Sequence, residues 1–278
     1  MLQKLLITFF LLGLTIYADI IDDGLRAYSN GNKQEAMILF YDACDDKKMA
    51  GCYNLGVIYS KGDGVEKNIK KAIKFYDRAC IGNDKRACNN LAYMYEIGNG
   101  VQQDKSKAEK LYSKACNYNL MSACYNLGLM FLDGNNIKKK QKVVKLWAKA
   151  CNGNHYNACF NLGLAYDKGN MIKSNKERAA LFYSKACDGN NINACFNLAV
   201  YYSNGDGVKQ DKLKAVNLYT KACDGNRYDG CFNLGLLYYY GKGIKQEKVK
   251  AKKLFYKSCN GGYQNGCKNY RILNEQGI

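Results

Sequence analysis

The residues of this chain best suited to chemistry are its 14 cysteines, which occur as pairs eight positions apart. Thiols serve either as metal ligands or as disulfide partners. A structural zinc site needs closely spaced Cys or His pairs, whereas these pairs are wider and the only histidine is His155. We therefore expect disulfides, with no metal and no cofactor. The pairs are Cys44 with Cys52, Cys80 with Cys88, Cys116 with Cys124, Cys151 with Cys159, Cys187 with Cys195, Cys223 with Cys231, and Cys259 with Cys267.

The pairs recur at a nearly fixed period, because their first members follow one another at steps of 36 residues with a single step of 35. Such a period is the signature of a solenoid of helix pairs. Repeat symmetry joins each first cysteine to the second cysteine of its own pair. Two antiparallel helix ends would meet there and bring the Cα atoms to the roughly 5.5 Å that a disulfide needs.

Each period contains two helical patterns. The first, helix A, follows the second cysteine and reads C-x-N-L-G/A-x-x-Y/F, as in Cys52, Leu55, Gly56 and Tyr59. This spacing places the four residues on one helix face, and the small residue lets a neighbouring helix approach closely. Glycine readily takes the left-handed conformation that ends a helix. We expect helix A to end at Gly62, Gly98, Gly134, Gly169, Gly205 and Gly241.

The second pattern, helix B, alternates alanine with aromatic residues at helical spacing, as in Ala72, Phe75, Tyr76 and Ala79. Large side chains on one helix need small ones opposite them, so this face is predicted to be core. Trp147, the only tryptophan, occupies the aromatic position of its repeat and is predicted to pack there.

The first 18 residues have the features of a secretory signal peptide. Lys4 precedes an apolar run from Leu5 to Tyr17, and Ile16-Tyr17-Ala18 is a suitable cleavage site. The alternative is an uncleaved anchor, for which the run is short of the roughly 20 residues that span a bilayer. Export to an oxidising compartment explains the cysteines, so a secreted or periplasmic protein is expected.

These features resemble the Sel1-like repeat family, which is related to tetratricopeptide repeats. The motif A-x-x-x-L-G-x-x-Y-x-x-G-x-G-V-x-x-D-x-x-K-A-x-x-x-Y-x-x-A is matched by Ala194 to Ala222. With a C-x7-C pair in every repeat, the chain is more similar to the Helicobacter cysteine-rich proteins. Stacked pairs with a constant step predict an all-α, right-handed superhelical solenoid of about seven disulfide-stapled repeats, with A helices lining the concave side.

We expect one continuous structure, because no linker or low-complexity segment interrupts the chain and proline is absent. The predicted parts are a signal peptide over residues 1–18, a solenoid over 19–265 with repeats 19–50, 51–86, 87–122, 123–157, 158–193, 194–229 and 230–265, and a capping helix over 266–278.

One polar residue recurs beside the buried leucine of helix A, at Asn54, Asn90, Asn126, Asn161, Asn197, Asn233 and Asn269. An amide offers both a donor and an acceptor, as an extended peptide backbone requires. The resemblance to tetratricopeptide proteins implies that these asparagines bind a peptide, with aromatic pocket walls from Tyr53, Tyr125, Phe160, Phe196 and Phe232. The alternative is that each asparagine holds the neighbouring helix.

The chain is strongly basic, with a formal net charge of +18. Lysines gather near the start of helix B and are expected on the outer side and rim. They are Lys67, Lys70, Lys71, Lys74, Lys138, Lys139, Lys140, Lys142, Lys145, Lys245, Lys248, Lys250, Lys252 and Lys253. Such a surface attracts polyanions such as acidic lipids, or it simply keeps the protein soluble. Nucleic acid is not expected as a partner of an exported protein.

An enzymatic activity is implied only by resemblance, since the cysteine-rich family is classed as penicillin-binding with slow β-lactamase activity. The sequence has no S-x-x-K, S-D-N or K-T-G motif. Tyr202-Ser203-Asn204 matches a Y-x-N element, but Tyr202 holds the aromatic repeat position. We expect a monomeric scaffold that binds a peptide or protein. The alternatives are a weak hydrolase that binds β-lactams or peptidoglycan fragments, and a polyanion-binding surface.

Overall fold

The computed structural model describes residues 20–132, 137–241 and 243–278, and this part of the chain is helical without any strand. The predicted signal peptide and Gly134 lie outside the described residues. After a helix over residues 20–29, the elements are α2 (Lys33–Asp45), α3 (Met49–Lys61), α4 (Ile69–Ile81), α5 (Lys85–Ile97), α6 (Lys105–Asn117), α7 (Met121–Met130), α8 (Ile137–Asn152), α9 (Tyr156–Lys168), α10 (Lys176–Asp188), α11 (Ile192–Asn204), α12 (Lys212–Asp224), α13 (Tyr228–Tyr240), α14 (Lys248–Asn260) and α15 (Gln264–Glu275).

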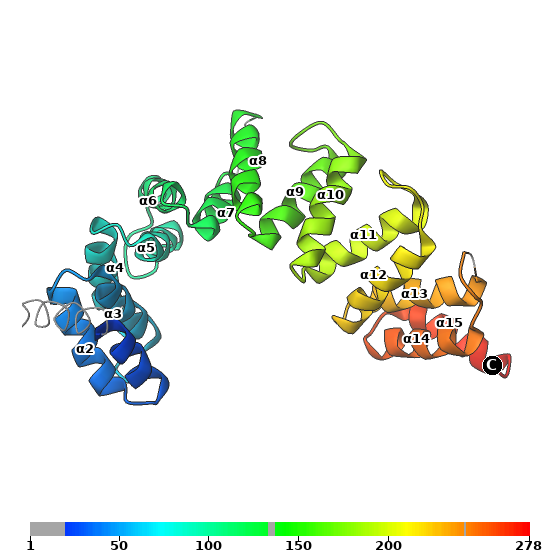
Figure 1. The fold of residues 1–278 in the computed structure, drawn as a ribbon, viewed down its shortest axis with the longest axis horizontal. Coiled ribbons are helices and arrows are strands. Elements are labelled where there is room, and N and C mark those ends of the chain that lie inside the picture. The colour runs from blue at the N-terminus through cyan, green and yellow to red at the C-terminus, as the bar shows by residue number, and fades with distance from the viewer. Residues whose placement is uncertain (1–19, 133–136, 242) are drawn as a thin grey trace, which may run out of the picture. The chain divides into compact units, whose positions relative to one another are not determined.

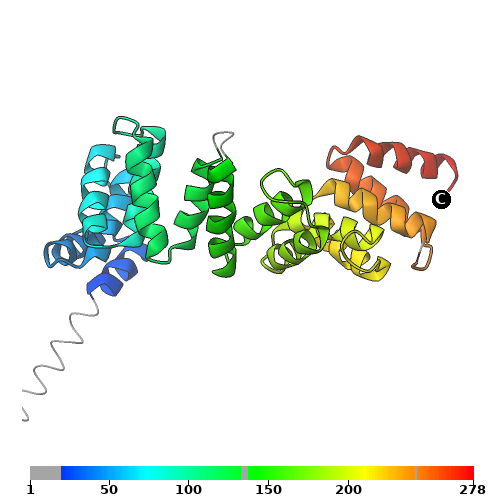
Figure 2. The ribbon, with the colours of Figure 1, turned by 90° about the horizontal axis from the view of Figure 1, so that it is seen from above.

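The chain divides into two compact units, Met1–Leu127 and Gly128–Ile278. Within each unit, consecutive helices pack side by side in chain order, as Figures 1 and 2 show for α3 with α4 and for α13 with α14. The short connections make these neighbours antiparallel. The all-α solenoid predicted from the period is therefore confirmed, with helix A at α3, α5, α7, α9, α11, α13 and α15 and helix B at the even-numbered helices.

Seven disulfides join the end of each helix B to the start of the following helix A, and the predicted pairing within each repeat is confirmed. Their Cα–Cα distances run from 4.4 to 4.8 Å, shorter than the expected 5.5 Å because the two helix ends approach closely. The bridges are Cys44–Cys52, Cys80–Cys88, Cys116–Cys124, Cys151–Cys159, Cys187–Cys195, Cys223–Cys231 and Cys259–Cys267.

The loop inside each bridge turns at a residue in the left-handed conformation. This residue is usually asparagine, which tolerates that conformation better than most side chains. The second cysteine of each pair, such as Cys88, Cys124 or Cys231, then lies in the first turn of the next helix A. The left-handed asparagines are Asn83, Asn119, Asn154, Asn190 and Asn226.

Helix ends follow the expected local chemistry. Helices α3, α5, α9, α11 and α13 are capped by glycine in the left-handed conformation, for example Gly62 with φ 75° and Gly205 with φ 85°. Several B helices begin with an Asp or Asn whose side chain accepts a backbone N–H of the first turn, which satisfies an otherwise unpaired donor. These N-caps are Asn68, Asp104, Asn175 and Asp211.

The predicted close approach between helices occurs at the small residue of helix A. A Cβ added to Gly56 would lie 2.5 Å from the Tyr76 ring, and one added to Gly163 would lie 2.5 Å from the Tyr183 ring. Glycine therefore makes room for the helix B aromatic side chain, which becomes almost wholly buried. The same relation holds in the tryptophan repeat, where a Cβ on Gly128 would lie 2.4 Å from the indole nitrogen of Trp147.

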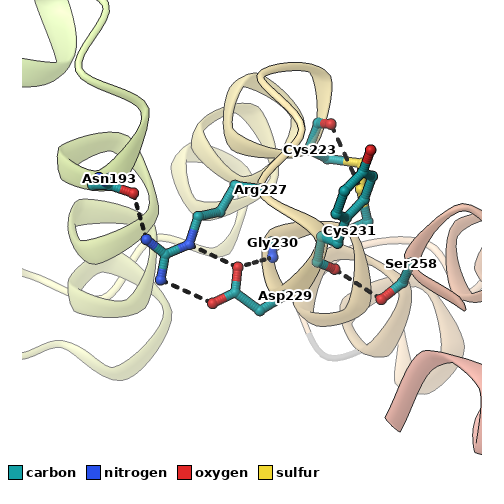
Figure 3. A network of polar contacts seen from close by, with 8 residues as sticks. Asn193, Cys223, Arg227, Asp229, Gly230, Cys231 and Ser258 are labelled. Carbon is teal, nitrogen blue, oxygen red and sulfur yellow. Dashed lines mark hydrogen bonds and ion pairs between the residues drawn. A yellow bond between two sulfur atoms is a disulfide. The ribbon is translucent and has the colours of Figure 1, made fainter. Parts of the chain in front are cut away.

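Neighbouring repeats are also tied by hydrogen bonds. A basic side chain near the end of one helix B donates to the cysteine carbonyl that ends the preceding helix B: Lys114 to Cys80 and Lys221 to Cys187, both at 2.7 Å. Figure 3 shows a second tie, in which Arg227 pairs with Asp229 on α13 and reaches Asn193 on α11. Within each unit, these repeats are thus fixed to one another through polar contacts as well as through the core.

None of the described helices combines the length and apolar character needed to cross a membrane.

Candidate functional site

The helix A asparagines, defined as Asn54, Asn90, Asn126, Asn161, Asn197, Asn233 and Asn269, are all half-buried. They share one turn of helix A with the buried leucine that follows most of them, so the helix period brings their amides to the border between core and surface. In this position an amide can contact the neighbouring helix and a ligand at the same time.

Several of these amides bind a buried tyrosine of the preceding helix B. The pairs are Tyr76 with Asn90, Tyr183 with Asn197, and Tyr219 with Asn233. The Asn126 amide differs, because it donates to the side-chain oxygen of Asn89 at 3.1 Å. The alternative in which asparagine holds the neighbouring helix therefore has a direct structural basis in these repeats. Whether the same amides also bind a peptide stays a prediction.

The buried tyrosine reaches a second partner on the helix A that precedes it, a contact that sequence reasoning missed. Tyr112 donates to Glu96 at 2.8 Å and Tyr183 to Asp167 at 3.3 Å, while Tyr76 lies 3.4 Å from the Ser60 hydroxyl. These partners all stand eight residues after the second cysteine of a pair. We call this position after-eight. In the repeats whose helix B carries the tyrosine, the after-eight residues are Ser60, Glu96, Asp167 and Ser203.

The after-eight carboxylate of Asp167 has the largest set of donors. Tyr201 donates to it at 2.6 Å from α11, in addition to Tyr183 and Lys176 from α10. Burial by itself would raise the pKa of Asp167, but these hydrogen bonds outweigh burial and lower the pKa. The ionised side chain therefore ties α9, α10 and α11 together.

The predicted pocket walls pack against helix B aromatics, and their role in a peptide site stays a prediction. Ring centroids are 6.1 Å apart for Tyr53 with Tyr76 and 6.0 Å for Phe160 with Tyr183. Phe196 and Phe232 make the same contact with the next aromatic residues, Tyr219 and Phe255. These side chains are half-buried, as is Tyr125, and their rings extend the core toward the surface.

Three cavities open on the face of helix A that carries the asparagine. Their volumes are about 440 Å³ beside Asn90, about 560 Å³ beside Asn161 and about 150 Å³ beside Asn269. Each is also lined by the residue three positions later, respectively Tyr93, Leu164 and Ile272. The recurrence places an amide and an apolar side chain together at equivalent points of three repeats.

Ser203 has a lysine neighbour that the sequence motifs did not indicate. Lys212 Nζ lies 3.2 Å from the Ser203 hydroxyl and donates to the Ser203 carbonyl oxygen at 2.6 Å. Lys176 makes the equivalent contact with Asp167 one repeat earlier. The repeat symmetry therefore marks the Ser203–Lys212 contact as part of helix stacking.

Several of the predicted surface lysines lie on aromatic rings. Lys250 Nζ is 4.1 Å from the ring centroid of Tyr238 and donates to its hydroxyl at 2.8 Å. Lys71 lies 5.1 Å from the centroid of the Tyr59 ring. These cation–π contacts hold the start of helix B against the end of helix A, so part of the lysine excess serves the fold. Lys138 and Lys139 have side chains outside the described set.

Comparison with known proteins identifies the repeat. The profile of the family described as Sel1 repeat matches residues 50–84, 85–117, 122–155, 157–191, 192–226 and 229–263. HcpC of Helicobacter pylori, which is named as a candidate beta-lactamase, is 43% identical over 53 residues, or 19% of this chain and 18% of HcpC. The chain thus matches less than a fifth of this relative.

Two solved structures have the same fold. The protective antigen c5321 of uropathogenic Escherichia coli, described as having an SLR fold, superposes with a TM-score of 0.85 at 25% identity over 94% of this chain and 57% of that one. A Sel1 repeat protein from Oxalobacter formigenes gives a TM-score of 0.72 at 28% identity over 86% of this chain and 99% of that one. With six matched segments and these relatives, the chain belongs to the Sel1 repeat family.

Proposed function

We propose that this protein is an exported scaffold that binds an extended segment of a partner protein along the asparagine-bearing faces of the A helices within one compact unit. Sel1 repeats generally mediate protein–protein interactions. The observation that carries the proposal is the recurrence of cavities beside Asn90, Asn161 and Asn269. Each cavity offers an amide for a peptide backbone and an apolar wall for a side chain, which are the two requirements of extended-chain recognition.

The contact between asparagine and tyrosine leaves capacity for a ligand. A side-chain amide has two donor hydrogens and an oxygen with two lone pairs, whereas one tyrosine hydroxyl occupies only one of these. Asn197 and Asn233, fixed by Tyr183 and Tyr219, are therefore oriented in advance without being saturated. Orientation before binding reduces the entropy lost when a flexible partner is held.

Export is supported by the disulfides, since seven bridges indicate an oxidising compartment outside the cytoplasm. The signal peptide proposed for residues 1–18 supplies the route. N-terminal sequencing of protein taken from the native cell envelope and medium is the direct measurement. A mature N-terminus near residue 19 is expected, and retention of residues 1–18 would contradict the proposal.

The binding proposal predicts a large effect of removing three amides together. A partner is first captured with oxidised protein and identified by mass spectrometry. Each amide-to-backbone bond contributes about 0.5 to 1.5 kcal/mol, so Asn161→Ala, Asn197→Ala and Asn233→Ala combined should weaken partner binding about 10- to 2,000-fold. Isothermal titration measures the affinity, and circular dichroism shows whether the variant remains folded.

The matched control is the double variant Tyr183→Phe and Tyr219→Phe, which removes the hydroxyls while keeping every amide. Its affinity for the partner should stay within a few-fold of that of the unmodified protein. Normal binding by the folded asparagine variant, or an equal loss in both variants, would show that the amides act only in helix stacking. A lysine control, Lys245→Gln with Lys248→Gln and Lys253→Gln, should lower mainly the association rate and the salt dependence. Its complete loss of binding at every salt concentration would assign the partner as a polyanion.

A second candidate function, slow β-lactam hydrolysis, is favoured by the local identity with HcpC. Because the Ser203–Lys212 contact repeats the Asp167–Lys176 contact and belongs to helix stacking, we expect any hydrolysis of a chromogenic cephalosporin to be slow and unchanged in Ser203→Ala. Lys212→Met removes the lysine of the same contact and should likewise leave any hydrolysis unchanged. Loss of turnover in both variants, with unchanged circular dichroism, would identify Ser203 as a nucleophile.

A further inference from the structure

The cavity of the tryptophan repeat differs from the equivalent cavity beside Asn90, which is lined by Ser60 and Tyr76. In repeats with a helix B tyrosine, the after-eight residue is polar: Ser60 before Tyr76, Glu96 before Tyr112, Asp167 before Tyr183 and Ser203 before Tyr219. In the repeat with Trp147, the after-eight residue is Leu132. In this repeat the aromatic side chain therefore has no hydroxyl, and the after-eight side chain has no polar group. Both Leu132 and Trp147 line the cavity of about 560 Å³.

All residues that line this cavity belong to the second unit. Leu132 follows α7, Lys140 and Trp147 come from α8, and Met171 comes from the loop after α9. From α9, the side chains of Asn161, Leu164, Ala165 and Lys168 line the cavity at the spacing of one helix face, and Asn170 follows. The lining therefore combines apolar with polar side chains and includes an indole that is only 2% exposed.

Among the described residues that line the cavity, the charged side chains are those of Lys140 and Lys168. Neither lysine forms a salt bridge with any carboxylate in the described ranges 20–132, 137–241 and 243–278. The carboxylate that precedes Lys168 in the sequence, Asp167, is already engaged by Tyr201, Tyr183 and Lys176. Apolar side chains beside two positive charges that no described carboxylate pairs with are complementary to an apolar group that carries one negative charge.

We propose that this cavity binds a compact apolar group bearing a carboxylate, with the apolar part against Trp147 and Leu164 and the carboxylate between Lys140 and Lys168. The inference deepens the proposed binding function by naming the chemistry of one subsite. The volume lies within the range of about 300 to 1,000 Å³ found for small-molecule sites. The same chemistry is offered by the C-terminal residue of a peptide and by a free aliphatic acid.

Trp147 makes the test direct, because the single indole of the chain lies in the wall of the proposed site. Oxidised mature protein is titrated with acetyl-Leu-Leu as the free acid, with its carboxamide and with octanoate, while indole fluorescence is followed. The free acid should change the fluorescence saturably, and the carboxamide should bind at least about tenfold more weakly because it lacks the charge. Tighter binding of the dipeptide acid than of octanoate indicates a peptide terminus, and the reverse indicates a free acid.

The variants separate this subsite from general basicity. Lys140→Met with Lys168→Met should lose at least about tenfold in affinity for the acid at low salt. The matched control, Lys173→Gln with Lys209→Gln, removes the same charge from exposed loop positions and should change affinity less than about twofold. No saturable fluorescence change with either acid, equal binding of acid and carboxamide, or equal losses in both variants would overturn the proposal.

The titration needs no natural partner, so its outcome is independent of the partner search. If the acid binds and the triple asparagine variant keeps its affinity for the partner, the subsite proposal holds and the extended-groove proposal fails. If the triple asparagine variant keeps its affinity for the partner and the acid does not bind, both proposals fail.

Discussion

Reduction of the seven disulfides is expected to unfold most of this protein at physiological temperature. Each bridge closes a short loop, for which the chain-entropy estimate gives about 2 to 3 kcal/mol. In a repeat array each unit contacts only its neighbours, so few distant contacts compensate for a lost bridge. We expect reduced and alkylated protein to melt on the order of 20 °C or more below the oxidised form, as followed by circular dichroism at 222 nm.

The position of a bridge should decide how much its removal costs. Cys187 and Cys195 are almost fully buried in the middle of the second unit, whereas Cys259 and Cys267 are half-buried at its end. Cys187→Ala with Cys195→Ala should therefore destabilise more than the same double change at the terminal pair, because it also leaves a cavity in packed core. If the reduced protein kept its helicity and its Tm within about a degree, the cross-links would not stabilise the array.

Alkaline solution is expected to unfold the protein through the buried tyrosines of helix B. Burial raises the pKa of Tyr76, Tyr112 and Tyr183, and it raises the pKa of Tyr219 to about 12. A folded-state pKa above the ordinary value of 10 means that the native state favours the neutral hydroxyl. The corresponding stability is complete below pH 10 and is lost as the pH rises from 10 through the folded-state pKa.

The variant Tyr219→Phe isolates one such contribution. At pH 8 it should lose about 1 kcal/mol, because the hydrogen bond with Asn233 is removed. Near pH 11.5 it should be more stable than the unmodified protein, since about 2 kcal/mol of ionisation penalty has been removed. Urea unfolding measured across this pH range gives both values. Tyr256→Phe, at a 49% exposed position on the neighbouring helix B, is the matched control, and a crossover in that variant as well would contradict the assignment.

The periodic features of the sequence predict the fold because each depends on local chemistry. The cysteine spacing gives the helix boundaries, and the glycines at 62, 98, 169, 205 and 241 end their helices as expected. The small residue of helix A also faces the aromatic residue of helix B as predicted. For these residues, the position within the repeat is enough to predict the structural role.

The polar contacts between helices were not predictable in the same way. Periodicity shows which face a residue occupies, but not which side chain stands opposite it on another helix. The pairing of Tyr112 with Glu96 and the contact of Lys212 with Ser203 depend on that second fact. A signal was nonetheless present: polar residues recur eight positions after the cysteine, and Leu132 breaks the pattern in the repeat that also replaces tyrosine with Trp147.

The locality of the disulfides has a consequence for how the chain is made. Because both cysteines of each pair lie within one short loop, their effective concentration for each other far exceeds that for any distant thiol. Loops of this length close in about 10 to 100 ns, so each bridge can form once its own loop has emerged into an oxidising compartment. Pairing then proceeds from the N-terminus without waiting for the remaining sequence. Duplication or loss of one period adds or removes a complete bridge, which allows the chain to change length without ever leaving an unpaired thiol.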